Sequence, residues 1–398
     1  MENFRMYVPT DIRFGKNRLT ELEEVLLKYG NRVLLVYGGG SIKKTGLYDE
    51  IMTKLGKDKF HVVELSGINP NPRIDSVREG IRLVREEKLE VILAVGGGSV
   101  VDAAKVIAGG VYYEGDAWDL VVDSEKMGNA IPIVDILTLA ATGTEMNRNA
   151  VISNPETQEK LGTSGWELIP KVSFLDPTIT FTVPPVQTSA GIADTLSHLF
   201  EQYFNRTEGN DVQNFLSEGL MQAVIKNSPV VLQDPENYDA RANLLWASTL
   251  ALNGLCSKGN SGAWSCHPIE HELSAYYDIT HGIGLAIITP RWMKFCIDND
   301  SSTHSKFALY GKNIWKLDGD NDEAIARKAV ELTYHFFKDI LSIPMTLSEV
   351  GIQSDALVNE MAKQAVLYGN LESGPYVPMS IENVEAVLLD CFMEMAEF

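Results

Sequence analysis

Acidic and imidazole side chains recur at a four-residue spacing within residues 191–284. Asp194 and His198 form one such pair, and His267 and His271 form another. Residues four apart on a helix lie on one face, about 6 Å from each other, so a carboxylate oxygen and an imidazole nitrogen can point at one position. The spacing is typical of metal ligands, and four of the chain's seven histidines lie in this stretch.

A further candidate ligand, His281, follows ten residues after His271. A straight helix would place His267 and His281 about 21 Å apart at ~1.5 Å per residue, too far to share an ion with ligand bonds of ~2 Å. If both bind, the chain must turn back, and residues 276–280, which are turn-prone and β-branched, are the expected place. An Asp with two or three His makes an oxygen and nitrogen site suited to Fe(II), Zn(II), Mn(II), Co(II) or Ni(II).

The pattern of secondary structure that would position these residues differs between the two halves of the chain. Strand-like runs at 32–37, 60–65, 91–95 and 131–137 alternate with helix-like runs at 47–55, 74–87 and 100–108. This alternation predicts a parallel sheet covered on both faces, whose ligands bind beyond the carboxyl ends of the strands. From Ser189 onward helical periods dominate, at 191–204, 212–226, 238–255, 322–340 and 355–368. We therefore predict an α/β domain at 1–182 and an all-helical domain at 183–398.

Length and charge limit the function classes. A chain of 398 residues is long enough for two or three domains. The formal net charge of −20 argues against nucleic acid or an anionic membrane as a partner. We find no secretory signal, no apolar run of about 18 residues, and no C-x-x-C pair among Cys256, Cys266, Cys296 and Cys391. These features predict a cytoplasmic protein that acts on small molecules.

Two loops of three glycines follow predicted strands, Gly38-Gly-Gly-Ser41 and Gly96-Gly-Gly-Ser99. Such a loop lets the backbone approach a ligand, and the amides of a following helix favour phosphate. Neither matches the G-x-G-x-x-G or P-loop fingerprint, and each alone is equally consistent with a tight turn. Two on one sheet favour a nucleotide, with Asp102 accepting hydrogen bonds from it.

The first loop bears on the choice of dinucleotide. A carboxylate at this place commonly binds the ribose of NAD and would repel the 2′-phosphate of NADP. Here Gly39 leaves space, Ser41 offers a donor, and Lys43 or Lys44 is near enough to attract phosphate. The sequence therefore favours NADP(H) over NAD(H).

Taken together, the Gly96 to Asp102 loop, the loop at 138–145, Asp194-x-x-x-His198 and the His267 to Gly282 run resemble those of the iron-containing, group III alcohol dehydrogenases. Within them the chain is similar to the NADPH-dependent butanol dehydrogenase and aldehyde reductase branch. The resemblance implies a Rossmann-like dinucleotide domain, a helical domain, a cleft between them, and a homodimer. This is a dehydroquinate synthase-like architecture.

Carried over residue by residue, the resemblance makes Asp194, His198, His267 and His281 the metal ligands, with Fe(II) favoured and Zn(II) as the alternative. His271 matches the family's non-ligand histidine near the nicotinamide and is the candidate catalytic residue. The implied nucleotide contacts are Gly38, Gly39, Gly40, Ser41, Asn71, Gly97, Gly98, Ser99, Asp102, Thr138, Thr142, Asn147, Asn149 and Lys160. The chain departs from NAD-preferring members at Gly39, where many have Asp, and in the loop Thr138-Leu-Ala-Ala-Thr-Gly143.

The expected reaction is hydride transfer between NADP(H) and a primary alcohol or aldehyde, such as butanol and butyraldehyde, with the metal as Lewis acid. One alternative is a zinc polyol dehydrogenase of the same fold. An alternative from another class is a zinc peptidase, because His267-Pro-Ile-Glu-His271 fits H-x-x-E-H with Glu270 as the general base.

Overall fold

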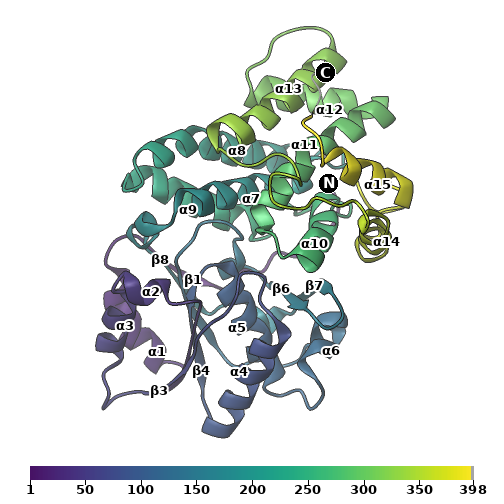
Figure 1. Cartoon of the computed structure of the whole chain (residues 1–398). Helices are drawn as coiled ribbons and strands as arrows, with labels where there is room; N and C mark the ends of the chain where they lie inside the picture. The colour runs from purple at the N-terminus through teal and green to yellow at the C-terminus, as the bar shows by residue number, and fades with distance from the viewer. Residues whose placement is uncertain (396–398) are drawn as a thin grey trace. The chain divides into compact units, whose positions relative to one another are not determined.

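The structure is a computed structural model that describes residues 1–395, and the chain forms two compact units (Figure 1). The α/β unit comprises Tyr7–Pro184 and Pro235–Asn253. The helical unit comprises Met1–Met6, Pro185–Asp234 and the chain from Gly254 onward. These units differ from the ranges 1–182 and 183–398, because residues 235–253 return to pack with the α/β unit.

A six-stranded sheet forms the centre of the α/β unit, in the order β1-β8-β5-β4-β2-β3. Every pair of neighbours in it is parallel, as the alternation of strands and helices predicts. The strands are β1 (Asp11–Phe14), β2 (Arg32–Tyr37), β3 (His61–Leu65), β4 (Val91–Gly96), β5 (Ile133–Leu137) and β8 (Val172–Leu175). Strands β1 and β8 were not predicted, since four residues are too few to show a period.

Helices cover both faces of this sheet. On one face, Leu34 and Val36 of β2 share a core with residues of α4 (Ile74–Glu87), α5 (Gly98–Gly110) and α6 (Ala117–Val122). On the other face, Val33 and Leu35 share a core with residues of α1 (Leu22–Leu27), α2 (Ser41–Lys44) and α3 (Leu47–Leu55). Successive side chains of a strand point to opposite faces, so an uninterrupted apolar strand supplies both cores.

Three further elements complete the α/β unit. Strands β6 (Asn149–Asn154) and β7 (Glu159–Ser164) pair as an antiparallel hairpin. Helix α9 (Tyr238–Leu252) packs against two short helical turns, Thr144–Met146 and Pro177–Thr182. The Thr249 hydroxyl on α9 donates to the buried carboxylate of Glu145. This contact is one reason that α9 belongs to the α/β unit.

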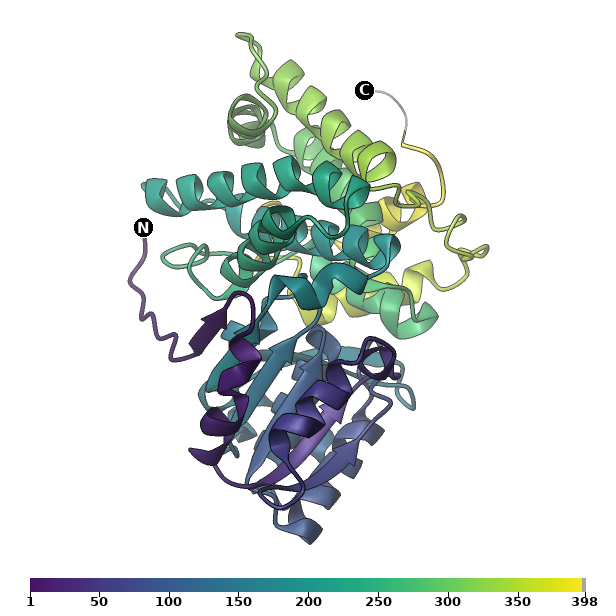
Figure 2. The ribbon, with the colours of Figure 1, turned by 90° about the vertical axis from the view of Figure 1, so that its left-hand side faces the viewer.

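The helical unit contains no strand among its described residues. Its elements are α7 (Pro185–Tyr203), α8 (Asp211–Gln233), α10 (Cys266–Tyr277), α11 (His281–Asn299), α12 (His304–Ile314), α13 (Asp322–His335), α14 (Val358–Gly369) and α15 (Ile381–Asp390) (Figure 2). Sixteen of the nineteen residues of α7 are buried, Thr188–Tyr203 without a break. A helix that is buried all round lies at the centre of its unit.

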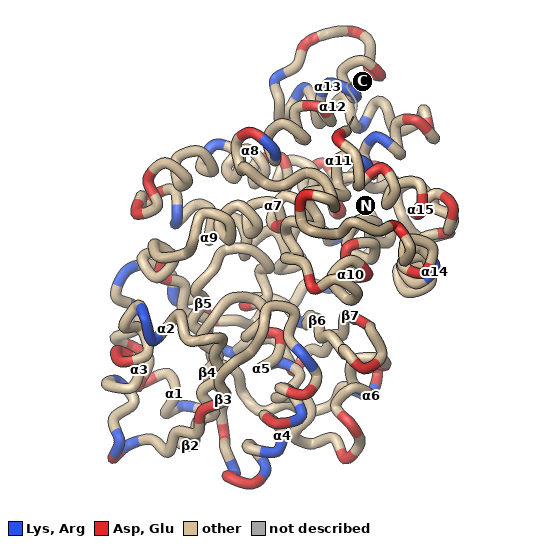
Figure 3. The backbone as a smooth tube through the Cα atoms, viewed as in Figure 1, with Lys and Arg blue, Asp and Glu red and all other residues tan. Residues whose placement is uncertain are grey.

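Charged residues are spread over both units. Figure 3 shows acidic and basic residues interspersed along the helices and loops, with acidic ones in excess, as the 54 Asp and Glu against 34 Lys and Arg require. Within residues 1–395, no helix combines the length and the apolar character needed to cross a bilayer.

Candidate metal centre and nucleotide loops

Three helices carry the candidate metal ligands. Asp194 and His198 lie on α7, His267 and His271 on α10, and His281 is the first residue of α11. Helix α10 ends at Tyr277, and Asp278 follows in the left-handed conformation with φ of 52°. The chain therefore turns back between His271 and His281, within the stretch where the sequence predicted it.

This turn brings a carboxylate and imidazoles together. One ligating atom each of Asp194, His267 and His281 lie within 4.8 Å of one another. His198 is not one of these three, but its Nε2 lies 3.5 Å from Oδ1 of Asp194, and its ring stacks on His267 at 4.8 Å between centroids. The four predicted ligands thus form one cluster.

His271 lies at the edge of the cluster. Its ring is 6.4 Å from that of His267 and 5.7 Å from that of His281, between centroids. His271 also forms a second close group with Glu270 and His281, whose ligating atoms lie within 4.8 Å of one another. The side chain is half-buried. A group in this position is adjacent to the cluster without being enclosed by it.

Two glycines set the position of His281. A β-carbon on Gly282 would lie 2.0 Å from the carbonyl oxygen of Ala190, so α11 begins in direct backbone contact with α7. A β-carbon on Gly284 would lie 2.8 Å from Cγ of Glu270, so α11 also approaches α10 closely. These approaches bring Nε2 of His281 to 3.8 Å from Oδ1 of Asp194.

A buried carboxylate holds the His267 ring. Glu201, on α7, accepts hydrogen bonds from the backbone N–H of Ser265 at 2.8 Å and of His267 at 2.9 Å. Its Oε1 also lies 3.2 Å from Nδ1 of His267. Nε2 of His267 is buried and has no hydrogen-bond partner within residues 1–395. The carboxylate therefore engages Nδ1, and Nε2 is the ring nitrogen available to a metal ion.

A second buried carboxylate holds the His281 ring in the same way. Glu270 is fully buried, its Oε2 pairs with Nδ1 of His281, and its Oε1 accepts from the hydroxyl of Ser274. Neither Glu201 nor Glu270 was predicted from the sequence to orient a histidine. A buried carboxylate already paired with a histidine is poorly placed to activate water, which argues against the peptidase role considered for Glu270.

The donor set of this cluster fits a divalent metal. Burial, with the neighbouring His267 and His281, holds the pKa of His198 well below its ordinary value, so the ring is neutral. Neutral imidazole is the form that binds metal. One carboxylate with three imidazoles and no thiolate is a borderline donor set that suits Fe(II) or Zn(II).

In the α/β unit, the two triple-glycine loops lie where the connections of the sheet diverge. Strands β2 and β4 are hydrogen-bonded neighbours. From β2 the chain passes to β3 on one side, and from β4 it passes to β5 on the other. Such a topological switch point opens a crevice beyond the carboxyl ends of the two strands, and ligands of open α/β sheets bind there.

The glycines of these loops serve different purposes. A β-carbon on Gly96 would meet Val100 at 2.5 Å, and one on Gly98 would meet Oγ1 of Thr142 at 2.4 Å, so close packing requires both glycines. At Gly39 and Gly40 a β-carbon would meet nothing within 4 Å. Space beside the first loop was expected at Gly39, and Gly40 additionally needs glycine because its φ is 101°.

Backbone hydrogen bonds tie the loops of neighbouring strands together. The N–H of Gly67, after β3, donates to Gly38 at 3.1 Å, and that of Thr138, after β5, donates to Gly96 at 3.0 Å. The N–H of Ser153 donates to Pro72 at 2.8 Å, which joins the loop of Asn71 to the hairpin. The predicted nucleotide residues thus gather on loops at one end of the sheet and on the adjoining hairpin.

Two of the predicted nucleotide contacts are engaged within the protein. Asp102 accepts from the Thr144 hydroxyl at 2.5 Å and from the Val151 N–H at 2.9 Å. The Asn147 amide accepts from Lys105 at 3.0 Å and from the Asn149 N–H at 2.9 Å, and donates to the Gly143 carbonyl at 2.9 Å. Their main role in this structure is to hold the loop after β5 against α5 and β6.

Lys105 was not predicted, yet it organises this region. It is fully buried and donates to Thr144 Oγ1, to the Asn147 carbonyl and amide oxygens, and to the Asn149 carbonyl, at 2.7 to 3.0 Å. Burial lowers the pKa of Lys105 to about 8, against the influence of Asp102, Asp135 and Glu145. Lys160 of β7 is also buried, whereas Asn149 is exposed at the start of β6.

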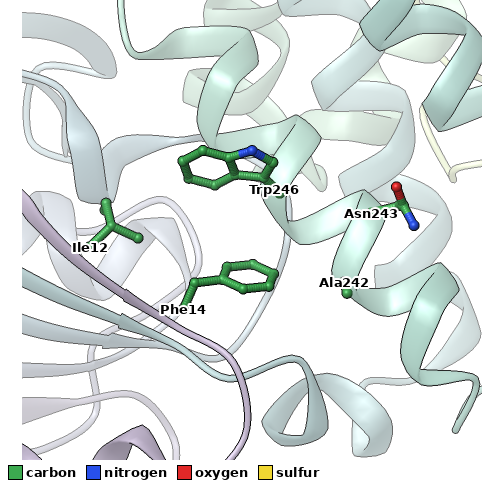
Figure 4. A pocket seen from close by; sticks show the side chains of 5 residues that line it. All are labelled: Ile12, Phe14, Ala242, Asn243 and Trp246. Atoms are coloured by element: carbon green, nitrogen blue, oxygen red, sulfur yellow. The ribbon is translucent and has the colours of Figure 1, made fainter.

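A pocket of about 390 Å³ lies elsewhere in the α/β unit, between β1 and α9 (Figure 4). It is lined by Ile12, Phe14, Ala242, Asn243 and Trp246, with the Phe14 and Trp246 rings edge-to-face at 6.0 Å. None of the predicted site residues lines it. None of these five lining side chains is ionisable, so they offer no acid, base or nucleophile for catalysis.

Two family models match the chain. The model for iron-containing alcohol dehydrogenase matches residues 9–177, and that for the C-terminal part of the Fe-containing alcohol dehydrogenase family matches residues 188–392. Together they cover nearly the whole chain.

Individual relatives agree with these models. The chain is 50% identical over 385 residues to NADH-dependent butanol dehydrogenase A of Clostridium acetobutylicum, covering 96% of this chain and 98% of the relative. It is 37% identical over 361 residues to the NADPH-dependent aldehyde reductase YqhD of Escherichia coli, covering 90% and 91%. Among solved structures, NADH-dependent butanol dehydrogenase A of Thermotoga maritima matches with a TM-score of 0.92 and 39% identity over 99% of both chains.

Proposed function

The chain belongs to the iron-containing alcohol dehydrogenase family, and from that premise we propose how its residues perform the reaction of an alcohol dehydrogenase and aldehyde reductase. The observation that carries the proposal is the cluster of Asp194, His267 and His281, with two of its imidazoles held by buried carboxylates. The α/β unit supports it with two glycine loops at a topological switch point.

In the reductive direction the carbonyl carbon gains a hydride and its oxygen gains a proton. One aldehyde, one reduced nicotinamide and one proton then yield one primary alcohol and one oxidised nicotinamide. The dinucleotide supplies the hydride. A divalent ion, Fe(II) in first place and Zn(II) as the alternative, would be held by Asp194, His198, His267 and His281 and would supply Lewis-acid polarisation of the carbonyl oxygen.

The chain's own residues hold and move the other groups. The Gly97 and Gly98 amides, at the start of the thirteen-residue helix α5, are proposed to bind the diphosphate of the dinucleotide. His271, half-buried at the edge of the cluster, is proposed to carry the proton between the substrate oxygen and solvent. The burial of Asp194, His198 and His267 keeps water from their ligating atoms.

We propose a short primary aldehyde such as butyraldehyde, with butanol as the product, as the substrate pair. The names of the Clostridium and Thermotoga relatives support this choice. A zinc polyol dehydrogenase of the same fold is the second candidate. Its substrate class, though not its metal, is supported by a 1,3-propanediol dehydrogenase of Citrobacter freundii, to which the chain is 30% identical over 383 residues.

The preference for NADP(H) remains a prediction. The open space at Gly39 supports it, as does the name of the Escherichia coli relative. Two relatives of higher identity, at 50% and 48%, are named NADH-dependent. We therefore propose that the chain accepts both dinucleotides, with the ratio set by side chains beside Gly39.

The test of this function is the oxidation of NADPH and NADH with butyraldehyde by metal-stripped protein, to which Fe(II) or Zn(II) is returned separately. We expect oxidation that is lost with the metal and restored by one of the two ions. If the protein reduces 3-hydroxypropanal, the aldehyde that corresponds to 1,3-propanediol, in preference to butyraldehyde, and does so only when zinc is returned, the polyol dehydrogenase is favoured. Oxidation of neither dinucleotide under either metal would refute the proposed function.

Two further expectations accompany the function. We propose that the protein is a homodimer and that it acts in the cytoplasm, as the resemblance and the sequence composition predicted. Light scattering of the purified protein tests the first, since a dimer of this chain has twice the 44.0 kDa mass of the monomer. Fractionation of cells tests the second.

A further inference from the structure

Lys43, which the sequence offered as an attractor of phosphate, lies in a cluster of its own. Its Nζ is 3.7 Å from Oε2 of Glu64 on β3. The same ammonium lies over the ring of Tyr37, at 5.0 Å from the centroid, and over that of Tyr48, at 4.5 Å. Its charge is therefore already balanced by a carboxylate and two aromatic faces.

Glu64 is the centre of this cluster. The Tyr37 hydroxyl donates to its Oε2 at 2.5 Å, and the Tyr48 hydroxyl donates to its Oε1 at 2.6 Å. Partial burial opposes the ionisation of Glu64, but the two tyrosines and Lys43 outweigh it, so its pKa is lowered. Both carboxylate oxygens are thereby fixed in position and negatively charged at neutral pH.

The cluster adjoins the open part of the first glycine loop. Tyr37 is the last residue of β2, and Lys43 follows Ser41 by two residues on α2. The N–H of Ile68, just after β3, donates to the Tyr37 carbonyl at 3.2 Å, so the end of β3 that carries Glu64 stays beside this loop. In sheets of this kind, the ribose of a dinucleotide lies at the carboxyl end of the strand next to the phosphate-binding loop. Here that strand is β2.

We infer that Glu64 is a specificity-determining residue of the proposed nucleotide site. Its carboxylate occupies Lys43 and opposes a 2′-phosphate from the strand next to β2, as a carboxylate beside the ribose generally does in sites that prefer NAD. The inference rests on the proposed dinucleotide site. It predicts that Glu64 lowers the affinity for NADP(H) without altering the reaction.

The test compares the wild type with Glu64→Gln, which keeps the shape of the side chain and removes its charge. The probes are 5′-AMP and adenosine 2′,5′-bisphosphate, which differ only by the 2′-phosphate, with dissociation constants measured by calorimetry. Removing one charge near a phosphate should raise the relative affinity for the bisphosphate about three- to tenfold. The ratio of kcat/KM for NADPH to that for NADH should rise by a similar factor.

Two other variants keep the test specific. Glu50→Gln makes the same charge change on α3, where Glu50 pairs with Lys54 at 3.4 Å, and it should leave both ratios unchanged. Lys43→Met should lower the relative affinity for the bisphosphate.

Salt provides a further check. In about 1 M salt, where the Debye length is about 3 Å, the ratio of relative affinities between Glu64→Gln and the wild type should fall towards one.

The inference is overturned if the relative affinity for the bisphosphate and the kcat/KM ratio of NADPH to NADH are the same in Glu64→Gln as in the wild type. It is also overturned if both quantities rise equally in Glu64→Gln and Glu50→Gln. Failure of the proposed function gives a different result. In that case the wild type would bind neither adenosine probe and oxidise neither dinucleotide, so there would be no ratio to compare.

Discussion

Gly282 lies so close to Ala190 that a β-carbon on Gly282 would stand 2.0 Å from the Ala190 carbonyl oxygen. Because that oxygen belongs to the backbone of the buried helix α7, it cannot rotate away as the end of a side chain can. Helix α11 can therefore begin here only with glycine as its second residue. His281, the residue before it, owes its position beside Asp194 to this contact.

We expect Gly282→Ala to displace the start of α11, to destabilise the protein by about 1–3 kcal/mol, and to weaken metal binding. Thermal unfolding and the metal content after dialysis measure the two effects. Gly219→Ala is the matched control, because Gly219 is an exposed helical glycine whose β-carbon would meet nothing within 4 Å. The control should be neutral or stabilising. Full metal content in Gly282→Ala would contradict this account of the cluster.

Glu201 and Glu270 are expected to act on the metal through the histidines they hold. Exchanging either for Gln removes the negative charge and replaces one accepting carboxylate oxygen by an amide nitrogen that can only donate. We expect Glu201→Gln and Glu270→Gln each to lower metal affinity about 10–100-fold. Competition with a chromogenic chelator measures the affinity.

The control for these two variants is Glu360→Gln, a similar exchange at an exposed position of α14. Circular dichroism should show that all three variants remain folded. Unchanged affinity in Glu201→Gln and Glu270→Gln would mean that packing alone orients the rings of His267 and His281.

Lys105 is expected to stabilise the loop that precedes β6. In Lys105→Met, the oxygens of Thr144, Asn147 and Asn149 lose a buried donor, and Asp102 loses a nearby cation. We expect a loss of roughly 3 kcal/mol in the free energy of unfolding, together with weaker binding of 5′-AMP. Lys126→Met, at an exposed position 4.0 Å from Asp123, should change neither quantity. If Lys105→Met is as stable as the wild type, the hydrogen bonds of Lys105 make no net contribution to the free energy of unfolding.

Lys306 predicts a pH dependence of stability. Burial lowers its pKa to about 8 from the ordinary 10.5, while Glu218 and Asp211 oppose the shift. Between pH 8 and pH 10.5 the unfolded chain holds a proton on this amine that the folded protein has released. Unfolding therefore takes up a proton, and the free energy of unfolding rises with pH in this window.

We expect the wild type to gain about 1–2 kcal/mol relative to Lys306→Met between pH 8 and pH 10. Below pH 8 both states hold the proton, so the difference should be constant. Urea unfolding of the two proteins at several pH values measures it. A difference that stays flat up to pH 10 would contradict the lowered pKa.

Much of the α/β unit was readable from local patterns. Apolar runs of five or six residues followed by glycines predicted β2 and β4, and helical spacing predicted α3 and α4 to the residue. Strands β1 and β8 and the hairpin were missed. Their residues are few or mixed in polarity, and their pairing partners lie far away in the sequence.

The candidate ligands were also readable, because a four-residue spacing is a property of one helix. The distance along a straight helix also predicted the turn before His281. Glu201 lies 66 residues from His267, and Lys105 lies 39 to 44 residues from the groups it bonds, so neither was predicted. Local periodicity contains no information about such pairs.

What the sequence determined by itself is therefore the strongly patterned strands and helices, the loops that end them, and the residue types capable of metal and nucleotide chemistry. Only the tertiary structure decided which of these residues meet. It paired His267 with Glu201 and His281 with Glu270, engaged Lys43 with Glu64, and returned α9 to the α/β unit. The physical reason is that propensity and periodicity act over one or two helical turns, whereas burial and close approach depend on the packing of elements distant in the chain.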